Sequence, residues 1–591
     1  MRQTLLLALI MGCTSLAQAQ DTFTESNDPT QPTAQEWQAT RGMHAAWGTS
    51  NVRYAWHAMP ETKELKRTAT LDAWRGERVS TQALIYSSVP TDSLAPITLQ
   101  LSAFKNGRHT LPAEAMSAAF VRYVMTDAWS TPDGRGAGCG YRPDHTLYDS
   151  AMVADIIDPH AESMHMDAMS TRSVWVSCQV PADAATGTYS GTLSIKAGKR
   201  TIARLPLHIR VADRTLPDPK DWNFHLDLWQ NPFAEARYYG TPLWSDSHLE
   251  AMRPSMEMLA AAGQKVITAS IMHKPWNGQT EDHFDSMVTW MKRLDGSWEF
   301  GFDVFDRWVE FAMSCGIDEQ INCFSMIPWA LSFPYYDVAT NRMQVLRAAP
   351  GDAAYEEMWV AMLKAFSQHL REKGWFDITT IAMDERPMHA MQKAMAVIRK
   401  ADPSFKVSLA GNWHPEIEAD LYDYCIALDQ AELVPQEVLT RRQSEGKKTT
   451  VYTCCSTHKP NTFTFSVPAE GAWYGFYVAG TEYDGYLRWA YNSWVKHPLH
   501  DTRFRQWPAG DTYMVYPYGR SSVRFEKLIE GIQAYEKIRI LRDEFTREGD
   551  TAKLRKLEEV IEMFDFNSQY TDDFPSLIQQ GQDKLNALST R

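Results

Sequence analysis

Short hydrophobic stretches separated by turns fill the first third of the chain. From about residue 35 to residue 211, apolar and polar positions alternate, most clearly over residues 173–180 and again over 188–195. Alternation with a period of two is typical of strands that bury one face, and many such strands predict a β-sandwich. Residues 20–215 are therefore expected to form one domain, and two prolines at 217 and 219 indicate a stiff linker over 213–219.

After residue 220 the pattern changes to strand-like runs that alternate with helical ones. Strands are expected at 223–228, 265–271, 320–326, 378–383, 406–410, 424–428, 449–454 and 486–491, and helices at 249–262, 303–315 and 354–373. Strands that alternate with helices indicate a parallel sheet, and eight of them predict a (β/α)8 TIM barrel over residues 220–510. In that fold the catalytic groups lie at the C-terminal ends of the strands.

Residues 511–591 are predicted to form a helical extension that packs on the barrel. A strand-like run at 512–516 precedes long helical patterns at 520–544 and 553–564. In the sandwich, Trp74, Glu77 and Arg78 form a cluster that we interpret as an anchor for a domain interface rather than a ligand site. The expected fold class is thus a multidomain β plus α/β protein.

The N-terminus resembles an export signal. Arg2 supplies positive charge, residues 5–11 are apolar, and Ala17-Gln18-Ala19 is a small-x-small cleavage site, so residues 1–19 are predicted to be a signal peptide. An alternative is a lipoprotein signal at 10–13, with Cys13 acylated. On this signal we expect an exported protein, periplasmic or secreted. No other stretch approaches the ~18 apolar residues that span a bilayer, so no transmembrane segment is expected.

The composition indicates which class of ligand the protein binds. The chain contains 21 Trp and 24 Tyr residues, and flat rings in excess of what a core needs can stack on sugars. Its net charge of −14 and the lack of any run rich in Lys and Arg argue against nucleic acid. A neutral or weakly charged ligand such as a glycan fits better.

The cysteines indicate neither a disulfide framework nor a metal site. Eight are present, and seven remain once Cys13 is removed, so at least one is unpaired in a monomer. The neighbours Cys454 and Cys455 are poorly placed to bridge each other. Cys315 and Cys323 could pair or could be buried thiols. Because no C-x-x-C occurs and the His residues are scattered, no metal or other cofactor is expected.

Asp384 and Glu385 are the candidate catalytic residues. The Asp-Glu dipeptide also occurs at 318–319 and 543–544, but only the pair at 384–385 follows an apolar strand and precedes a helix with Pro387 in its first turn. This context places the pair at the catalytic end of a barrel strand. The alternative is that Asp384 is only an N-cap and that Glu385 is favoured there by the helix dipole.

The order of several segments resembles glycoside hydrolase family 123. The resemblance is carried by residues 73–82 (AWRGERVSTQ), 181–191 with GTY at 187–189, 381–385 (IAMDE), 485–494 (GYLRWAYNSW), and 516–517 (YP) followed by 522–524 (SVR). It spans most of the chain, and it implies a β-sandwich before a (β/α)8 barrel, β-N-acetylgalactosaminidase activity and an adjacent Asp-Glu pair. This chain has Arg386 between that pair and Pro387, where the family pattern places Pro directly after Glu.

Adjacent carboxylates suit hydrolysis of a 2-acetamido sugar. An ordinary retaining glycosidase needs two carboxyl groups facing each other at ~5 to 5.5 Å, one of them as nucleophile. If the acetamido oxygen of the substrate attacks instead, giving an oxazolinium ion, no protein nucleophile is needed. Asp384 is then expected, in ionised form, to orient the acetamide N–H. Glu385, protonated, is expected to act as general acid and afterwards as base.

Polar and aromatic residues near the ends of other strands are the candidates for substrate binding. They are His225, Asp227, Trp229, His273, Trp276, Trp329, Asn412, Trp413, Trp489, Tyr491 and Asn492. Aromatic faces can stack on the apolar face of a sugar ring, while amides and carboxylates hold its hydroxyl groups.

The sequence thus predicts a retaining exo-glycosidase that releases terminal β-linked N-acetylgalactosamine from a glycan or glycoconjugate. One alternative is a β-N-acetylglucosaminidase, since the two sugars differ only at the C4 hydroxyl. A second is a non-catalytic carbohydrate-binding or adhesion protein on the same scaffold, although a protein that only binds has no need of a general acid. The aglycone and the oligomeric state stay open.

Overall fold

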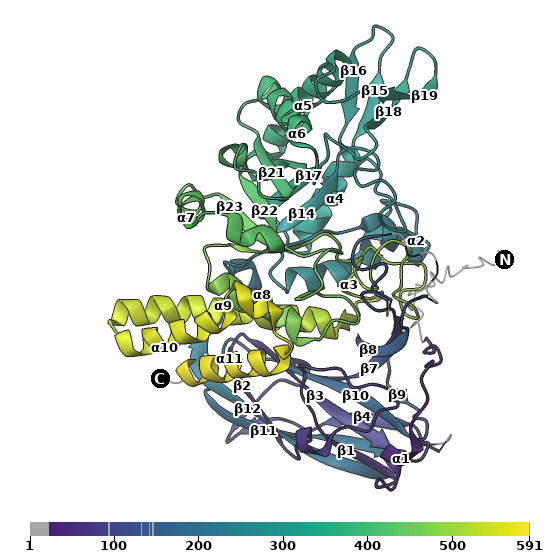
Figure 1. Ribbon diagram of the computed structural model, residues 1–591, viewed down its shortest axis with the longest axis vertical. Helices are drawn as coiled ribbons and strands as arrows, with labels where there is room; N and C mark the ends of the chain where they lie inside the picture. The colour runs from purple at the N-terminus through teal and green to yellow at the C-terminus, as the bar shows by residue number, and fades with distance from the viewer. Residues whose placement is uncertain are drawn as a thin grey trace, which may run out of the picture.

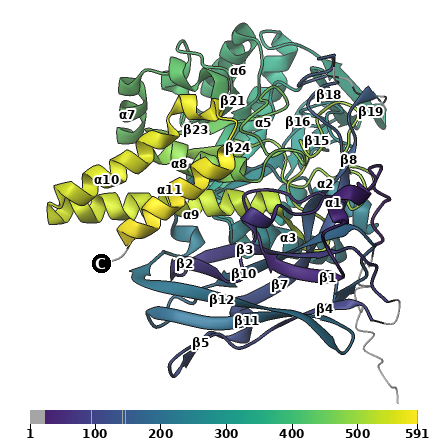
Figure 2. The same ribbon diagram turned by 60° about the horizontal axis from the view of Figure 1, so that its bottom comes forward.

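The computed structural model describes residues 23–92, 95–131, 133–140, 142, 144 and 147–589 (Figure 1). The predicted signal peptide and Cys13 lie outside these residues. A β-rich region comes first, a barrel of parallel strands follows, and helices end the chain, as the sequence predicts. In both views the C-terminal helices lie between the barrel and the sandwich (Figures 1 and 2).

The N-terminal region is a sandwich of two sheets. The first has the order β1 (Met43–Trp47), β3 (Arg78–Ser87), β10 (Ser170–Gln179), β7 (Met116–Thr126), β8 (Ala151–Asp158) and β25 (Ser521–Ser522). The second has the order β2 (Ala69–Arg75), β12 (Arg200–Thr215), β11 (Gly187–Ala197), β4 (Ile97–Leu101) and β9 (Ser163–Met164), with β5 (Lys105–Asn106) and β6 (His109–Thr110) at its side. A short helix, α1 (Ala34–Trp37), precedes them. Between the sheets lies an apolar core that includes Trp47, Leu193 and Leu207.

Eight parallel strands form the nearly closed barrel. They are β13 (His225–Leu228), β14 (Val266–Ser270), β17 (Gln320–Phe324), β20 (Thr379–Met383), β21 (Lys406–Gly411), β22 (Asp423–Ala427), β23 (Lys448–Tyr452) and β24 (Gly485–Arg488). From β14 to β24 each strand pairs with the next barrel strand in the chain, and β24 also pairs with β13. The remaining seam between β13 and β14 is bridged by the Lys265 N–H, which donates to the Leu226 carbonyl at 3.0 Å. Every predicted barrel strand is present.

Helices cover the outside of the barrel. They are α2 (Pro232–Tyr239), α3 (Asp246–Ala260), α4 (Asp303–Ser314), α5 (Ala353–Lys373), α6 (Met388–Ala401), α7 (Gln436–Ser444) and α8 (Ala469–Ala479). The chain then leaves β24 through a long connection and enters α9 (Val523–Glu548), which packs along α8. A Cβ added to Gly475 of α8 would lie 1.8 Å from the Gly531 carbonyl oxygen of α9, so only glycine allows this approach.

A small four-stranded sheet, which the sequence did not reveal, is inserted into the barrel. Its order is β16 (Trp298–Gly301), β15 (Thr289–Lys292), β18 (Ser332–Asp337) and β19 (Arg342–Arg347). Two of the strands follow β14 and two follow β17. The sheet is attached through Trp290, whose ring lies 5.1 Å from that of Trp359 in α5. It stands at the top of the molecule in Figure 1.

The last part of the chain consists of α9, α10 (Thr551–Ile561) and α11 (Phe574–Ser589). The strand expected at 512–516 is wrong. Tyr513 and Tyr516 make only isolated bridges, to Asn492 and Arg520, because this segment is buried among loops and has no neighbouring strand to extend. A two-residue strand, β25, instead pairs with β8 of the sandwich.

Two ion pairs join the sandwich to α9. Arg78 contacts Glu526 at 2.8 Å, and Glu77 contacts Lys537 at 2.5 Å. Trp74 is 1% exposed beside them. The cluster of Trp74, Glu77 and Arg78 therefore anchors a domain interface, as interpreted from the sequence.

One disulfide joins distant parts of the described chain. Cys139, in the loop between β7 and β8, bonds Cys455, in the loop after β23. Cys315 and Cys323 are both buried free thiols and are not paired. Among the described residues, no helix is long and apolar enough to cross a membrane.

Candidate active site

Asp384 follows β20 directly and lies at the C-terminal end of the barrel. Its Oδ2 accepts a hydrogen bond of 2.9 Å from the indole N–H of Trp329. It is not the N-cap of α6, because that position is Pro387 and no side chain caps the helix. Burial and the neighbouring Glu385 raise the pKa of Asp384 to about 6, although the Trp329 hydrogen bond lowers it. At neutral pH, Asp384 is therefore mostly an ionised acceptor.

Glu385 is more exposed than Asp384 and lines the same cavity. The hydroxyl of Tyr452, at the end of β23, donates a hydrogen bond to Glu385 Oε1. Burial and the charge of Glu385 raise the pKa of Tyr452 well above its ordinary value, so the phenol remains a donor.

The two carboxyl groups open into a cavity of about 350 Å³. Six aromatic residues line it, namely Trp229, Trp276, Trp329, Tyr452, Trp489 and Trp507. Its polar lining includes Gln279, Asn412 and Asp429 besides the carboxylate pair. A volume of this size with aromatic walls and a few polar groups is typical of a small-ligand site.

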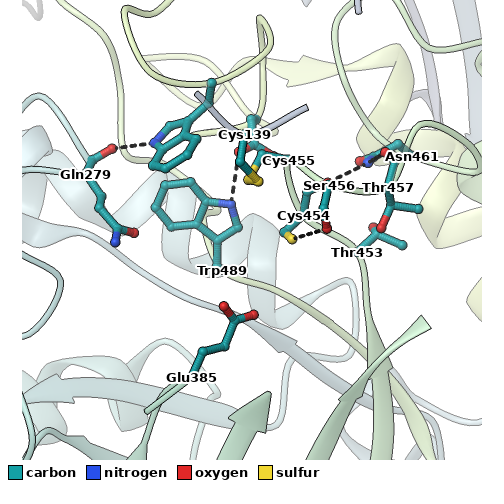
Figure 3. Close-up of a disulfide and its surroundings, with 12 residues drawn as sticks. Cys139, Gln279, Glu385, Thr453, Cys454, Cys455, Ser456, Thr457, Asn461 and Trp489 are labelled. Atoms are coloured by element: carbon teal, nitrogen blue, oxygen red, sulfur yellow. Dashed lines mark hydrogen bonds between the residues drawn. A yellow bond between two sulfur atoms is a disulfide. The ribbon is translucent and has the colours of Figure 1, made fainter. Parts of the chain in front are cut away.

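Aromatic rings meet at two sides of this cavity. Trp229 and Trp276 lie 4.9 Å apart, centroid to centroid, at an angle of 30°. Trp489 and Trp507 are 6.1 Å apart and almost perpendicular, at 82°. In Figure 3 the carboxylate of Glu385 points toward Trp489. The cavity that contains Glu385 thus offers several flat aromatic surfaces.

Charged groups orient two of these rings. The indole of Trp489 donates to Asp511 Oδ2 at 3.3 Å, and the other oxygen of Asp511 is held by the fully buried Arg488 at 2.6 Å. Trp329 lies between Asp384, which accepts from its indole, and Arg386, whose guanidinium is 5.0 Å from the ring centroid. These contacts fix both rings before any ligand arrives.

Five of the predicted binding residues line the cavity. They are Trp229, Trp276, Trp329, Asn412 and Trp489. Each of them follows a barrel strand. These five residues were thus correctly located by the rule that the active site of a TIM barrel lies at the C-terminal ends of its strands.

His225 and Asp227 lie inside the barrel instead, and each is 2% exposed. They belong to β13 itself rather than to the loop after it, so their side chains face the barrel interior below the cavity. Burial lowers the pKa of His225 to about 3. Asp227 accepts from the indole of Trp229 at 3.3 Å, so it contacts the cavity wall but does not line the cavity.

Four other predicted residues also lie outside the cavity lining. His273 bonds Asp285 at 2.8 Å, and Trp413 packs on the ring of Tyr424. The hydroxyl of Tyr491 donates to the Ser255 carbonyl, and the Asn492 amide donates to Glu235. Each of these side chains forms a hydrogen bond to, or packs on, a neighbour that does not line the cavity. This is the ordinary role of buried polar and aromatic groups in a folded protein.

Sequence reasoning missed Tyr452, Trp507, Gln279 and Asp429. Tyr452 ends β23, but the predicted strand continues to residue 454, so the sequence placed Tyr452 inside a strand rather than at its end. Trp507 could not have been found, since it lies in the connection between β24 and α9, far from any strand. Its indole donates to the Gln279 carbonyl at 2.8 Å, which brings two loops together at the cavity.

Comparison with known proteins agrees with this architecture. The family described as "Glycoside hydrolase 123, catalytic domain" matches residues 229–541, and "Glycoside hydrolase 123 N-terminal domain" matches residues 47–197. Comparison with curated proteins gives no match.

Among solved structures, a family 123 glycoside hydrolase from Clostridium perfringens has the same fold. It is 24% identical, with a TM-score of 0.80 over 93% of this chain and 97% of that one. A GH5 xyloglucanase from Bacteroides ovatus is much less similar, with a TM-score of 0.30 and 11% identity over 79% of this chain and 98% of that one. Because the catalytic-domain match alone covers more than half of the 591 residues, the chain belongs to glycoside hydrolase family 123.

Proposed function

We propose that this chain is a retaining exo-glycosidase that releases terminal β-linked N-acetylgalactosamine, with the 2-acetamido group of the substrate acting as nucleophile. The observation that carries the proposal is that Asp384 and Glu385, consecutive in the chain, line one small cavity at the end of one strand. Carboxyl groups on consecutive residues belong to one strand end, whereas the acid and nucleophile of a conventional retaining enzyme face each other at ~5 to 5.5 Å. This arrangement suits assistance from the substrate better than a protein nucleophile opposite a protein acid.

Asp384 is assigned the role of holding the acetamide. Its carboxylate already accepts from the Trp329 indole through Oδ2, and its pKa of about 6 leaves it ionised at neutral pH. An ionised carboxylate can accept the acetamide N–H, turn the acetamide oxygen toward the anomeric carbon, and offset the positive charge of the oxazolinium ion. Trp329 keeps the carboxylate in position for this task.

Glu385 is assigned proton transfer. It is the more exposed of the two carboxyl groups and receives a hydrogen bond from Tyr452. In the first step it gives its proton to the departing glycosidic oxygen. In the second step it takes a proton from the water that opens the oxazolinium ring, so the sugar leaves with its original configuration.

Two further features support a terminal sugar as substrate. The cavity of about 350 Å³ is small, and its aromatic walls offer stacking surfaces for the apolar face of a ring. The similar enzyme from Clostridium perfringens is described as hydrolysing glycolipid glycans, so glycolipid glycans are the first natural substrates to test here.

Export is part of the proposal. The pattern of residues 1–19 supports it, and a disulfide between Cys139 and Cys455 suits an oxidising compartment. The N-terminal sequence of the protein recovered from cells tests this point. A start near Gln20 supports signal cleavage, a lipid-modified Cys13 supports the lipoprotein alternative, and an intact Met1 in the cytosol contradicts export.

The main experiment measures hydrolysis of aryl β-glycosides of N-acetylgalactosamine, N-acetylglucosamine and galactose. We expect cleavage of the first, and a loss of at least about 100-fold in kcat for Glu385→Gln. Glu416→Gln is the matched control, because Glu416 is exposed on the loop after β21 and does not line the cavity. Preference for the N-acetylglucosaminide would change the sugar but keep the mechanism, whereas cleavage of the galactoside would contradict the mechanism.

Two additional measurements separate this mechanism from its rivals. Asp429 is the other carboxylate of the cavity, so a conventional nucleophile there would make Asp429→Asn as damaging as Asp384→Asn. We expect Asp384→Asn to be the more damaging of the two. The anomer first released, followed by NMR, is expected to be β, and an α product would exclude retention.

A further inference from the structure

Three sulfur atoms lie together at the rim of the catalytic cavity. Cys139 and Cys455 form the disulfide, with their Cα atoms 4.9 Å apart, and Cys454 is a free thiol. The Sγ atoms of all three lie within 4.8 Å of one another, and all three residues line the cavity that holds Glu385. Figure 3 shows the thiol of Cys454 beside the disulfide and Trp489 between the disulfide and Glu385.

The disulfide attaches a loop of the sandwich to the barrel. Cys139 belongs to the loop between β7 and β8, whereas Cys455 belongs to the loop after β23, 316 positions later. The ring of Trp129, in the same sandwich loop, stacks on His458 of the barrel loop at 4.8 Å. The N-terminal domain therefore contributes directly to the wall of the cavity.

The same sandwich loop also positions Trp507. The Gly140 N–H donates to the Gln506 carbonyl at 3.2 Å, and Asp127 accepts from the Ala509 N–H at 2.9 Å. Trp507 lies between these two contacts and faces Trp489 in the cavity. Detaching this loop from the barrel is therefore expected to change the position of Trp507 and its contact with Trp489.

We propose that Cys139, Cys454 and Cys455 form a thiol–disulfide exchange site, in which Cys139 bonds either of two neighbouring cysteines and a dithiol reductant can release it. We further propose that this bond determines the affinity of the Trp507 side of the cavity for the aglycone. The second statement rests on the proposed function, whereas the first depends only on the sulfur atoms.

The exchange step balances without an oxidant. The Cys454 thiolate attacks Cys139 Sγ, the bond between Cys139 and Cys454 forms, and Cys455 leaves as a thiolate that takes up the proton lost by Cys454. Attack on Cys455 Sγ is disfavoured, because adjacent Cα atoms are about 3.8 Å apart and disulfides usually need at least about 4.4 Å. The bond therefore moves between partners and keeps Cys139 attached.

Complete release needs a reductant of the dithiol class. The dithiol gives two electrons and becomes a disulfide, while Cys139 and its partner each take up a proton. Burial raises the pKa of the Cys454 thiol to about 11, so at neutral pH the thiol is protonated. Exchange is then slow at pH 7 and accelerates about tenfold per pH unit as the thiolate fraction grows.

The test of the exchange site is a map of disulfide-linked peptides after thiols are blocked at low pH. In Cys455→Ser we expect Cys139 to be bonded to Cys454, and in the double variant Cys454→Ser, Cys455→Ser we expect Cys139 to be free. Cys315→Ser is the matched control, because Cys315 is a buried free thiol outside the cavity. It is expected to keep the original bond. Free Cys139 in the single variant Cys455→Ser would overturn the exchange site.

The test of the aglycone role compares KM for an oligosaccharide with KM for an aryl glycoside in the same variant. Release of the loop in the double variant is expected to raise this ratio about fivefold, since loop ordering is then part of the cost of binding. Parent protein treated with dithiothreitol at pH 8 gives the same comparison without any substitution. An unchanged ratio after verified loss of the bond would overturn the aglycone role. If the parent protein were inactive on every glycoside, the proposed function would be contradicted. The peptide map would still test the exchange site, because it does not depend on activity.

Discussion

The Tyr452 hydroxyl donates a hydrogen bond to Glu385 Oε1, and this contact joins the ends of two barrel strands that are not neighbours in the sheet. Tyr452 ends β23, whereas Glu385 follows β20, with β21 and β22 between them. The bond therefore crosses the mouth of the barrel. It fixes the direction of a carboxyl group that is otherwise exposed to the cavity.

Replacing Tyr452 with Phe is expected to lower kcat by about tenfold, because a hydrogen bond to a charged group contributes about 1.5 kcal/mol or more. KM is expected to change less, since the ring remains in the wall. Steady-state kinetics on an aryl glycoside measure both values. Tyr336→Phe is the matched control, because the hydroxyl of Tyr336 bonds Asn341 in the inserted sheet. Equal losses in the two variants would show that the contact with Glu385 has no catalytic role.

The barrel could be predicted because its strands are short apolar runs with polar residues at their ends. That pattern is local, so each strand appears in the sequence within a few positions of its place in the structure, and Asp384 with Glu385 is found by the same rule. The inserted sheet escaped notice because its strands interrupt the alternation of strands and helices. Trp290 and Phe333 of this sheet contact Trp359, which is distant in the chain.

Which side chains reach the cavity was harder to predict. His225 and Asp227 alternate correctly for the inner face of β13, but alternation says nothing of depth along the barrel axis, and both lie too deep. The bond between Cys139 and Cys455 spans 316 positions and joins two domains, so no local pattern could reveal it. Trp507 is brought to the cavity by the same interdomain contacts.

The acid limb of the pH profile is expected to report Asp384. Activity needs its ionised form, and its pKa of about 6 predicts that kcat/KM falls as the pH drops below 6. The Trp329 indole stabilises the carboxylate, so Trp329→Phe is expected to raise that pKa and move the acid limb to higher pH. Trp298→Phe, in the inserted sheet, is the control. An acid limb that stays in place in Trp329→Phe would mean that another group controls it.

The packing of α8 against α9 is expected to tolerate no side chain at Gly475. A methyl group there would meet the Gly531 carbonyl oxygen, which is backbone and cannot rotate away. Gly475→Ala is therefore expected to cost about 3 kcal/mol or more in the free energy of unfolding. Gly278→Ala serves as control, because a Cβ at Gly278 meets no atom within 4 Å. Denaturant unfolding followed by circular dichroism measures both, and equal midpoints would contradict the close approach.

Asp384 is expected to lower the stability of the folded protein at neutral pH. Its pKa rises from the ordinary 3.8 to about 6 on folding, so the folded state binds the proton more tightly than the unfolded chain does. Protonation therefore favours folding. Below about pH 4, Asp384 does not lower the free energy of unfolding. The free energy lost through Asp384 grows as the pH rises toward 6 and is constant above it.

Asp384→Asn removes that cost while keeping the shape of the side chain. Its melting temperature is expected to exceed that of the parent at pH 7.5, with the difference shrinking toward pH 4, even though the variant has lost activity. The same substitution at Asp429, which is exposed in the cavity, is the control for replacing a carboxylate of the cavity. Scanning calorimetry at several pH values gives the comparison. A variant that melts below the parent at pH 7.5 would mean that the contact with Trp329 outweighs the cost of burying the carboxylate.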